Sequence, residues 1–405
     1  MTVKEKLASV SQEHLLKFEA ELSDTEKERL YAQIEGIDFS VVDTIKKRGH
    51  EIEKGVISPL KALTLSEIKE KEQTYREAGV KALKEGKVGT VLLAGGMGTR
   101  LGSNDPKGMY NVGLTKDLFI FECLINNLLD VVKECGEYIH LYVMTSDLNN
   151  EATINFFKEK NFFGYPEDHV TFFEQQMAPC CDYNGKVLLE RKDKVAVSPN
   201  GNGGWFLSMM RTGVLNQVKE HGIEWLNIFA VDNVLQRICD PVFVGATLVE
   251  DKSIGSKVVR KATPDEKVGV MCLEDGRPSI VEYYDLTDDM RDEVDANGER
   301  VYNFGVILNY LFKVSELEEI VKTSLPYHVV EKKIPYLNED GIEVHPEEPN
   351  GCKFEQLVLD MIHLADSCLP FEVVREREFA PIKNKTGVDS VESARVLLTK
   401  NGVTL

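Results

Sequence analysis

From Val88 onward the sequence alternates short apolar runs with patterns typical of amphipathic helices. A strand, helix, strand order is what a parallel sheet requires, because parallel strands need a crossover between them and usually bury both faces under helices. This alternation predicts an α/β fold with a largely parallel central sheet. The predicted strands and helices cover 90–94, 118–132, 139–144, 170–173, 203–218 and 225–231.

Three later apolar runs differ from the earlier ones. They lie at 268–272, 279–283 and 302–308 and have no long helical segments between them. Short connections suit antiparallel pairing, so the sheet is predicted to be mixed although mainly parallel. The acidic stretch 338–350, rich in Gly and Pro, is predicted to be a surface loop, and 390–399 a short terminal helix.

The first 85 or so residues have the pattern of helices. Leu15, Phe18 and Leu22 recur at helical spacing, and Ser23–Glu26 forms a capping box. A second box at Thr64–Glu67 is predicted to open a long charged helix that ends near Gly86. We therefore expect three parts along the chain. They are an N-terminal helical region 1–87, a catalytic domain 88–385 and a short helical tail 386–405.

The 405-residue chain carries 67 Asp and Glu against 48 Lys and Arg, a formal net charge of −19. A mean field of this sign repels nucleic acids and anionic membranes, so neither is expected as a partner. An anionic ligand must therefore meet a local cluster of cations or a metal. The sequence has no apolar run of about 18 residues and no signal-like stretch at its start, which predicts a cytoplasmic protein.

Eight cysteines occur without a C-x-x-C pair. The spacing argues against a zinc site, and the lack of a secretory signal argues against a disulfide framework. Cysteine in such a chain behaves as a small buried hydrophobe. We therefore expect eight free thiols with packing roles.

A glycine-rich string, Leu93–Gly102, follows the first predicted strand directly. Glycines permit positive φ and close backbone approach, so N–H groups can point at phosphate oxygens at the end of the sheet where α/β folds bind ligands. The dinucleotide fingerprint fails because Leu101 stands where a third glycine is needed, and the Walker pattern is absent. A purely structural turn is the alternative, but Arg100 and Lys107 supply cations beside it.

The string and its downstream Pro-Lys resemble the signature of the sugar-nucleotide pyrophosphorylases. Together with later blocks, the sequence resembles the eukaryotic UDP-N-acetylglucosamine (UDP-N-acetylhexosamine) pyrophosphorylases over about residues 88–395. This resemblance implies a Rossmann-like nucleotidyltransferase sheet with helices on both faces. It also implies a reaction that joins UTP and N-acetylglucosamine 1-phosphate into UDP-N-acetylglucosamine and pyrophosphate. The later blocks are Gln175, Asn200–Gly204, Val231–Asn233, Val268–Val270, Val281–Tyr283, His328–Pro335 and Arg375–Asn384.

The resemblance implies catalysis by alignment and charge. A sugar phosphate is mostly dianionic at neutral pH, so its attack in line on the α-phosphorus needs no general base. Arg100 and Lys107 are expected to stabilise the leaving pyrophosphate and the crowded phosphoryl oxygens, and Lys383 the sugar-linked phosphate. Asp232 is expected to hold Mg²⁺ with two phosphates and water, the alternative being a helix N-cap.

The remaining implied roles concern the nucleotide and the sugar. Gln175 is expected to bind uracil, because its amide offers both a donor and an acceptor, with backbone help from Gly201. The expected nucleotide residues are Leu93, Ala94, Gly95, Gly96, Gly98, Thr99, Gln175 and Gly201. The expected sugar residues are Asn202, Gly269, Glu282, Tyr283, Asn303, Leu357 and Leu359.

Two blocks depart from the family pattern. Tyr302–Val306 reads Tyr-Asn-Phe-Gly-Val in place of Phe-Asn-Ala-Gly-Asn, and Leu357 and Leu359 stand where aromatic residues are expected. The sequence therefore defines the identity of the sugar less well than that of the nucleotide. A glucose 1-phosphate or broad-specificity enzyme stays an alternative, as does a non-catalytic nucleotide-sugar-binding regulator. The chain stops soon after Lys383, where many members carry a further domain, and a monomer is expected.

Overall fold

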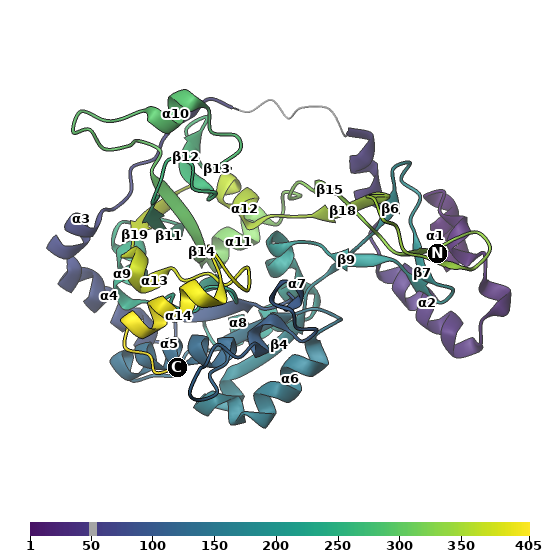
Figure 1. Cartoon of the computed structure of the whole chain (residues 1–405), viewed down its shortest axis with the longest axis horizontal. Helices are drawn as coiled ribbons and strands as arrows, with labels where there is room; N and C mark the ends of the chain where they lie inside the picture. The colour runs from purple at the N-terminus through teal and green to yellow at the C-terminus, as the bar shows by residue number, and fades with distance from the viewer. Residues whose placement is uncertain (48–54) are drawn as a thin grey trace. The chain divides into compact units, whose positions relative to one another are not determined.

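The computed structural model describes residues 1–47 and 55–405 (Figure 1). These residues form two compact units, each assembled from separate stretches of the sequence. The first contains residues up to 47, Gln176–Gly204 and Leu325–Val358. The second contains residues 55–175, Trp205–Ser324 and Leu359–Leu405. Packing units need not coincide with functional divisions, so the boundaries expected at residues 87 and 385 stay a prediction.

A large mixed sheet forms the centre of the second unit. Strands β10, β2, β3 and β4 lie side by side in parallel, and β14 pairs antiparallel with β10. The short strands β12 and β13 form an antiparallel hairpin beside β14. The predicted mixed sheet with a parallel core is confirmed. Its strands are β1 Ile57–Pro59, β2 Val88–Leu93, β3 Leu141–Thr145, β4 Val170–Glu174, β10 Trp225–Ala230, β11 Ile254–Arg260, β12 Val270–Glu274, β13 Arg277–Val281, β14 Phe304–Lys313 and β19 Cys368–Glu372.

Helices cover both faces of this sheet. Leu141 and Val143 of β3 belong to the same buried cluster as Leu124 of α5. Tyr142, between them, points the opposite way, as alternate strand residues must, and its hydroxyl lies 3.3 Å from Nδ1 of His221, directly after α8. The helices of this unit are α3 Leu65–Glu70, α4 Glu72–Lys84, α5 Ile120–Cys135, α6 Asn150–Glu159, α7 Trp205–Arg211, α8 Val214–Glu220, α9 Pro241–Val249, α10 Asp288–Asp292, α11 Val314–Ile320, α12 Val358–Leu364 (begun by the last residue of the first unit), α13 Arg375–Glu378 and α14 Val391–Lys400.

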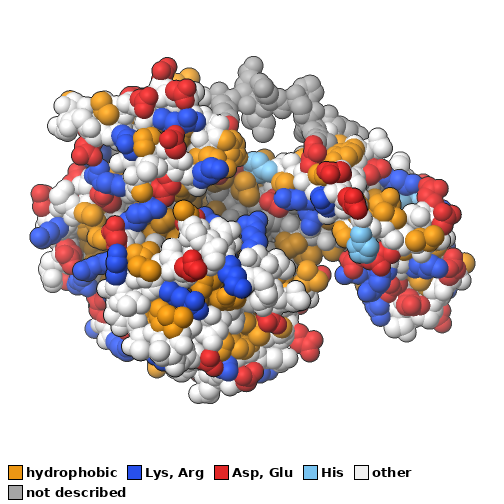
Figure 2. Space-filling view, viewed as in Figure 1, with side chains coloured by type: hydrophobic (Ala, Val, Ile, Leu, Met, Phe, Trp, Pro, Cys, Tyr) orange, Lys and Arg blue, Asp and Glu red, His pale blue; other side chains and the backbone are white. Residues whose placement is uncertain are grey.

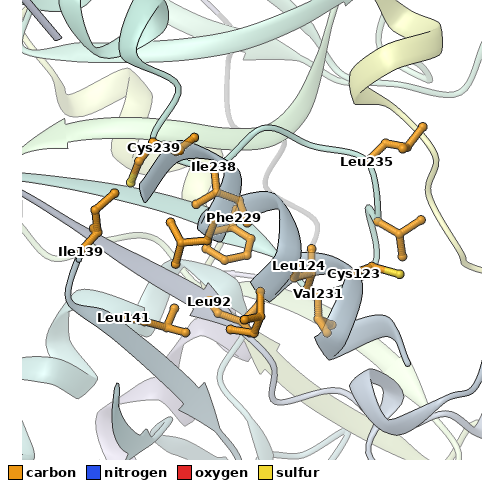
Figure 3. Packing of buried hydrophobic residues seen from close by; sticks show 14 of the residues in the cluster. Leu92, Cys123, Leu124, Ile139, Leu141, Phe229, Val231, Leu235, Ile238 and Cys239 are labelled. Carbon is orange, nitrogen blue, oxygen red and sulfur yellow. The ribbon is translucent and has the colours of Figure 1, made fainter. Parts of the chain in front are cut away.

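The position of the strands in the core explains why they appear in the sequence as short apolar runs. All six residues of β2 are buried, as expected for a strand covered on both faces. Figure 3 shows Leu92 of β2 and Phe229 of β10 packed with Leu124 of α5, and Ile238 completes this group. Burying such side chains contributes about 1.5–3 kcal/mol each before the entropy cost of folding is subtracted.

The first unit combines helices from the start of the chain with short strands from its middle and later parts. Figure 1 shows them as purple, teal and yellow-green segments respectively. Ser23 caps α2 as predicted, since its N–H donates to Glu26 Oε2 at 2.8 Å and its Oγ accepts from the Glu26 N–H at 3.4 Å. The elements are α1 Val3–Ser9, α2 Asp24–Gly36, β5 Met177–Pro179, β6 Cys181–Asp182, β7 Leu189–Arg191, β8 Lys194–Val195, β9 Val197–Pro199, β15 His328–Lys332, β16 Tyr336–Leu337, β17 Glu343–Val344 and β18 Gly351–Glu355.

Several local predictions were wrong in length or type. The helix capped at Thr64 ends after one turn and a half, and α4 follows beyond Lys71. The helix predicted over 203–218 is likewise two helices, α7 and α8, because Gly213 adopts a left-handed φ of 79°. Leu15, at its expected spacing, is buried, but in a 3₁₀ turn, which shares the three-residue repeat of a helix.

Two further differences concern strands. The predicted N-terminal helical region contributes β1, whose Ser58 pairs with Leu273 of β12. The predicted surface loop 338–350 contains β17, which pairs with β16 through Glu343 and Leu337. Both strands are only two or three residues long, and so short a segment carries no readable period.

The eight cysteines are free and buried, as predicted. Burial raises the pKa of Cys123, Cys239 and Cys272 to about 12, so these thiols stay protonated at neutral pH. Within residues 1–47 and 55–405, none of the helices has both the length and the apolar composition needed to cross a membrane.

Three histidine rings stack where β3 and β4 begin. The ring of His140 lies 3.7 Å from that of His221 and 4.7 Å from that of His169, with interplanar angles of 9° and 12°. Burial, together with the neighbouring charges of His221 and His169, lowers the pKa of His140 to about 4, while Asp168 opposes this shift. Folding therefore favours the neutral form of the His140 ring.

We expect the free energy of unfolding to fall as the pH decreases from about 6.5 towards 4. Unfolded His140 binds its proton near its usual pKa of 6.5, whereas the folded ring resists until about 4, so the unfolded state holds more protons in this window. The ring is only half-buried, so screening limits its contribution to on the order of 1 kcal/mol. Urea unfolding across this range should show a shallower pH slope for His140→Phe. An identical slope would place the pH dependence elsewhere.

Candidate active site

The glycine-rich turn leaves the carboxyl end of β2 and is fixed to the neighbouring strand. The Ala94 N–H donates to the Met144 carbonyl at 2.8 Å, and the side chain of Asn149 donates to the Ala94 carbonyl at 2.9 Å. Asn149 is fully buried and lies just before α6. Sequence reasoning missed it, because an Asn before a helix normally indicates a cap. Leu93 and Ala94 are buried, so only their main chain is available to a ligand.

The turn then folds back on itself. The Gly98 N–H donates to the Asp105 carbonyl at 2.8 Å, and the Lys107 N–H donates to the Gly96 carbonyl at 3.1 Å. These two bonds bring Lys107 next to the glycines. The N–H groups of the string were expected to point at phosphate oxygens. The Gly98 N–H does not fit this expectation, because it already has a partner within the turn. Thr99 is exposed and opens the 3₁₀ turn that follows.

Gly95 is needed for space rather than for an unusual backbone angle. The positive φ expected at positions 95, 96 and 98 is absent, and Gly102 is the glycine of this string with a left-handed φ, 78°. A Cβ atom at Gly95 would lie 2.3 Å from Nε2 of Gln175, which no side chain could tolerate without a shift. A Cβ atom at Gly96 would meet nothing within 4 Å, so this position faces open space.

Gln175 lies directly after β4 and covers the turn. Its N–H donates to the Thr145 carbonyl at 2.8 Å, and the residue is 8% exposed. Among the described residues its carboxamide has no hydrogen-bond partner, so the donor and the acceptor both remain available. The structure thus places the residue expected to bind uracil in contact with Gly95 of the turn.

Lys107 sits at the centre of a charged cluster. Its Nζ lies 3.9 Å from Oδ2 of Asp232, and its side chain is 16% exposed. Burial lowers the pKa of Lys107, Asp232 opposes this, and the charges of Arg100 and Lys383 lower it further. The two other expected catalytic cations and the expected metal carboxylate therefore all act on Lys107. Figure 2 shows Lys and Arg interspersed with Asp and Glu on the face in view, so the net negative charge does not prevent local cationic groups.

Main-chain hydrogen bonds join the segments that carry Asp232 and Lys383. The Ile382 N–H donates to the Asp232 carbonyl at 2.8 Å. Nζ of Lys383 lies 3.2 Å from Oδ2 of Asp389, and the lysine side chain is 44% exposed. Arg100 is exposed beside the turn.

The alternative role of Asp232 as a helix N-cap is wrong. No helix of the described chain begins directly after it. The next helix, α9, is capped by Asp240, whose side chain accepts from the Val242 N–H at 3.1 Å. Asp232 therefore keeps a carboxylate that is not used in capping.

Expected sugar residues of the second unit lie around the β12–β13 hairpin and the start of β14. A Cβ atom at Gly269 would lie 2.8 Å from Ile280 and 3.7 Å from Oε1 of Glu282. Tyr283 is half-buried next to Glu282. Oδ1 of Asn303 is buried and has no hydrogen-bond partner in the described residues. A buried acceptor of this kind is costly unless a ligand supplies a donor.

Gly201, Asn202 and Leu357 come together in the first unit. Gly201 has a φ of 86°, and a Cβ atom there would lie 2.3 Å from the Gln356 carbonyl oxygen. Oδ1 of Asn202 accepts from the Val358 N–H at 3.0 Å, which fixes its side chain beside Leu357. Leu359 lies in α12 and is half-buried within the second unit.

Gly108 is a further residue that sequence reasoning missed. A Cβ atom there would lie 2.2 Å from the ring of Phe121 in α5. The glycine therefore lets the segment that carries Lys107 lie flat on the helix. The only sequence signal is its place directly after the Pro-Lys pair.

Similarity to known proteins adds independent information. Residues 39–405 match the family described as UTP–glucose-1-phosphate uridylyltransferase. UDP-N-acetylhexosamine pyrophosphorylase-like protein 1 of Mus musculus is 36% identical over 410 residues, which cover 96% of this chain and 81% of that protein. UDP-N-acetylglucosamine diphosphorylase 2 of Arabidopsis thaliana is 35% identical over 422 residues, which cover 98% and 82%.

A solved structure extends this similarity to the fold. The crystal structure of the uridine diphosphate N-acetylglucosamine pyrophosphorylase from Trypanosoma brucei, in complex with an inhibitor, matches with a TM-score of 0.84 and 27% identity. The match covers 99% of this chain and 85% of that one. The resemblance first seen in the glycine-rich string and the later blocks is thereby confirmed.

Proposed function

Since this chain belongs to the UTP–glucose-1-phosphate uridylyltransferase family, we propose that it joins UTP and N-acetylglucosamine 1-phosphate to give UDP-N-acetylglucosamine and pyrophosphate. The observation that carries the proposal is the cluster of Lys107, Arg100, Lys383 and Asp232 beside a glycine turn covered by Gln175. The choice of the acetamido sugar is supported by the names of the two relatives, which refer to UDP-N-acetylhexosamine and UDP-N-acetylglucosamine.

The chemistry needs charge and alignment rather than a base. A phosphate oxygen of the sugar phosphate, already dianionic at neutral pH, attacks the α-phosphorus of UTP. The bond from the α-phosphorus to the bridging oxygen breaks, and pyrophosphate leaves with the electron pair. Lys107 is the cation best placed to stabilise this charge, since an ammonium that is largely shielded from water acts more strongly than one in bulk solvent.

Lys383 and Arg100 complete the assignment. We assign Lys383 to the sugar-linked phosphate, because its exposed side chain reaches out from a segment bonded to Asp232. Arg100 would meet the leaving pyrophosphate, because its side chain is exposed and its charge acts on Lys107. An exposed guanidinium can bind two phosphate oxygens at once.

The site fits a divalent cation such as Mg²⁺ that is held mainly by its substrate. Asp232 offers one carboxylate with 27% of its side chain exposed. The described residues contain no group of three His, Cys, Asp or Glu side chains that could enclose a metal. Mg²⁺ is commonly bound by one or two carboxylates with phosphates and water, so a single Asp is sufficient. When bound, the cation would neutralise phosphate charge, and Asp232 would hold it.

We expect Gln175→Leu to raise the KM for UTP and to weaken the preference for UTP over CTP and ATP. Leu keeps the volume over Gly95 but removes both hydrogen-bonding groups, which should lower kcat/KM for UTP by about 10–100-fold. Steady-state kinetics with the three nucleotides is the measurement. Gln73→Leu, on the exposed face of α4, is the control. An unchanged preference for UTP would assign uracil binding to another residue.

Pyrophosphate release with UTP, MgCl₂ and a panel of sugar 1-phosphates tests the proposed reaction. The expected order is N-acetylglucosamine 1-phosphate first, with N-acetylgalactosamine 1-phosphate weaker. A higher kcat/KM for glucose 1-phosphate would favour the glucose alternative. Binding of UDP-N-acetylglucosamine without release from any sugar phosphate would favour the regulatory alternative.

A further inference from the structure

A lysine with no exposed side-chain surface lies in the middle of β11. Nζ of Lys257 donates to Oε2 of Glu378 at 2.6 Å and to the Arg237 carbonyl at 2.9 Å, and it lies 3.4 Å from Oδ2 of Asp240. Its side chain has 0% exposure. An ammonium has three protons to donate, so these three oxygens satisfy it completely.

A buried ionic cluster of this kind is poorly explained by stability alone. Taking one ammonium and two carboxylates out of water costs several kcal/mol per ion, and well-packed apolar side chains are often as stable. Burial raises the pKa of Glu378 even though Lys257 opposes it. Such a cluster does, however, hold the segments that carry its members in one arrangement. Moving or removing one partner would leave a buried charge uncompensated.

The oxygens bound by Lys257 come from the two segments that carry candidate catalytic residues. Arg237 and Asp240 follow Asp232 in the loop after β10. Glu378 ends α13 and precedes Lys383 in the next loop. One ammonium therefore bonds to both segments at once.

Asn233 extends this connection to the site itself. Its Nδ2 donates to the Glu378 carbonyl at 2.7 Å, and its Oδ1 accepts from the Ala380 N–H at 2.9 Å. The next bond along is the one from the Ile382 N–H to the Asp232 carbonyl, at 2.8 Å. From Glu378 to the site, the two segments thus run together through consecutive short hydrogen bonds.

We propose that Lys257 is a positioning residue that sets the placement of Asp232 and Lys383 through Glu378 and Asn233. The role in uridylyl transfer rests on the proposed function. The ammonium of Lys257 bonds only to Glu378, Arg237 and Asp240 among the described residues, so it acts through them. Misplacing a reacting group by about 1 Å can cost 10²-fold in rate, so loss of this ammonium should appear in turnover.

The variants must separate positioning from folding. Lys257→Met alone leaves two buried carboxylates without their counter-ion, which is destabilising in itself. The charge-balanced variant Lys257→Met/Glu378→Gln removes one charge of each sign and keeps the side-chain sizes. The matched control is Lys219→Met/Glu318→Gln, an ion pair of the same unit at 2.5 Å whose side chains are exposed.

The experiment measures hydrogen exchange and steady-state kinetics on the full chain. In the charge-balanced variant, exchange at 231–234 and 380–383 should accelerate by about 10-fold or more, while β3 keeps its protection. The kcat should fall by about 10–100-fold with the KM for UTP nearly constant, because Gln175 and Gly95 are untouched. The control variant should change neither quantity.

Unchanged exchange in both segments, or a normal kcat in the folded charge-balanced variant, would overturn the proposal. A general loss of protection that includes β3 would do so too, since it would show a purely structural role. If the wild-type protein releases no pyrophosphate with any sugar phosphate, the proposed function fails. The exchange measurement still decides the effect of Lys257 on the two segments.

Discussion

Replacing Lys107 by alanine should lower kcat by about 10²–10³-fold, the usual effect of removing one preorganised transition-state donor. Its ammonium lies 3.9 Å from Asp232 and is largely shielded from water. We therefore expect it to act on the charge that develops in the transition state. The Kd for UTP should change much less. Rapid-quench or coupled pyrophosphate assays, with UTP titration calorimetry, measure the two effects.

Lys116→Ala, on the exposed loop after the turn, is the matched control and should leave both quantities unchanged. The pH profile supplies a second readout. Because burial and the charges of Arg100 and Lys383 lower the pKa of Lys107, its charge is lost at a lower pH than for an ordinary lysine. The alkaline decline of kcat/KM should therefore begin early in the wild type and weaken in Lys107→Ala. A variant with more than a tenth of normal kcat would contradict the assignment.

Asp232→Asn should reduce activity by about 10²-fold at fixed Mg²⁺ and raise the Mg²⁺ concentration needed for half-maximal rate. Asparagine keeps the shape of the side chain and one oxygen but removes the charge that a hard cation prefers. It also removes the carboxylate that opposes the lowered pKa of Lys107. Activity measured against MgCl₂ concentration, after removal of metal with EDTA, tests both effects.

Asp130→Asn, an exposed position of α5, is the control for this series. The control and the wild type should share one Mg²⁺ dependence. If Asp232→Asn shared it too, the carboxylate would have no part in metal binding, and the loss of rate would have to come from Lys107.

The parallel core was predictable because each of its strands is marked by a short apolar run in the sequence. A strand covered on both faces must be mostly apolar, and β2, β3 and β10 are, with Thr90, Thr145 and Asn227 as their buried polar residues. The breaks at Lys71 and Gly213 were not predictable in the same way. A period of apolar residues continues across a one-residue irregularity, so the pattern predicts one helix where the chain forms two.

The site was predictable in its residue types and only partly in its geometry. Arg100 and Lys107 stood out because cations next to a glycine turn oppose the net charge of the chain, whereas Lys383 was expected only from the resemblance to the pyrophosphorylases. The features of the site that the sequence did not predict depend on contacts between residues that are separated in the sequence. Gly95 is needed because of Gln175, and the Gly98 N–H is occupied by a turn residue. Likewise, the sequence around Lys257 does not show the carboxylates that surround its ammonium in the structure.

The discontinuous first unit has a consequence for biosynthesis. Its core joins Leu7 and Leu30, near the start of the chain, to Val195 and Phe354. On the ribosome, α1 and α2 emerge long before Phe354 is made, a delay of roughly 15–60 s at about 5–20 residues per second. During that time their apolar faces have no native partner and depend on chaperones or on transient contacts. Substitutions on these helices should therefore affect the yield of nascent protein more than the stability of the finished one.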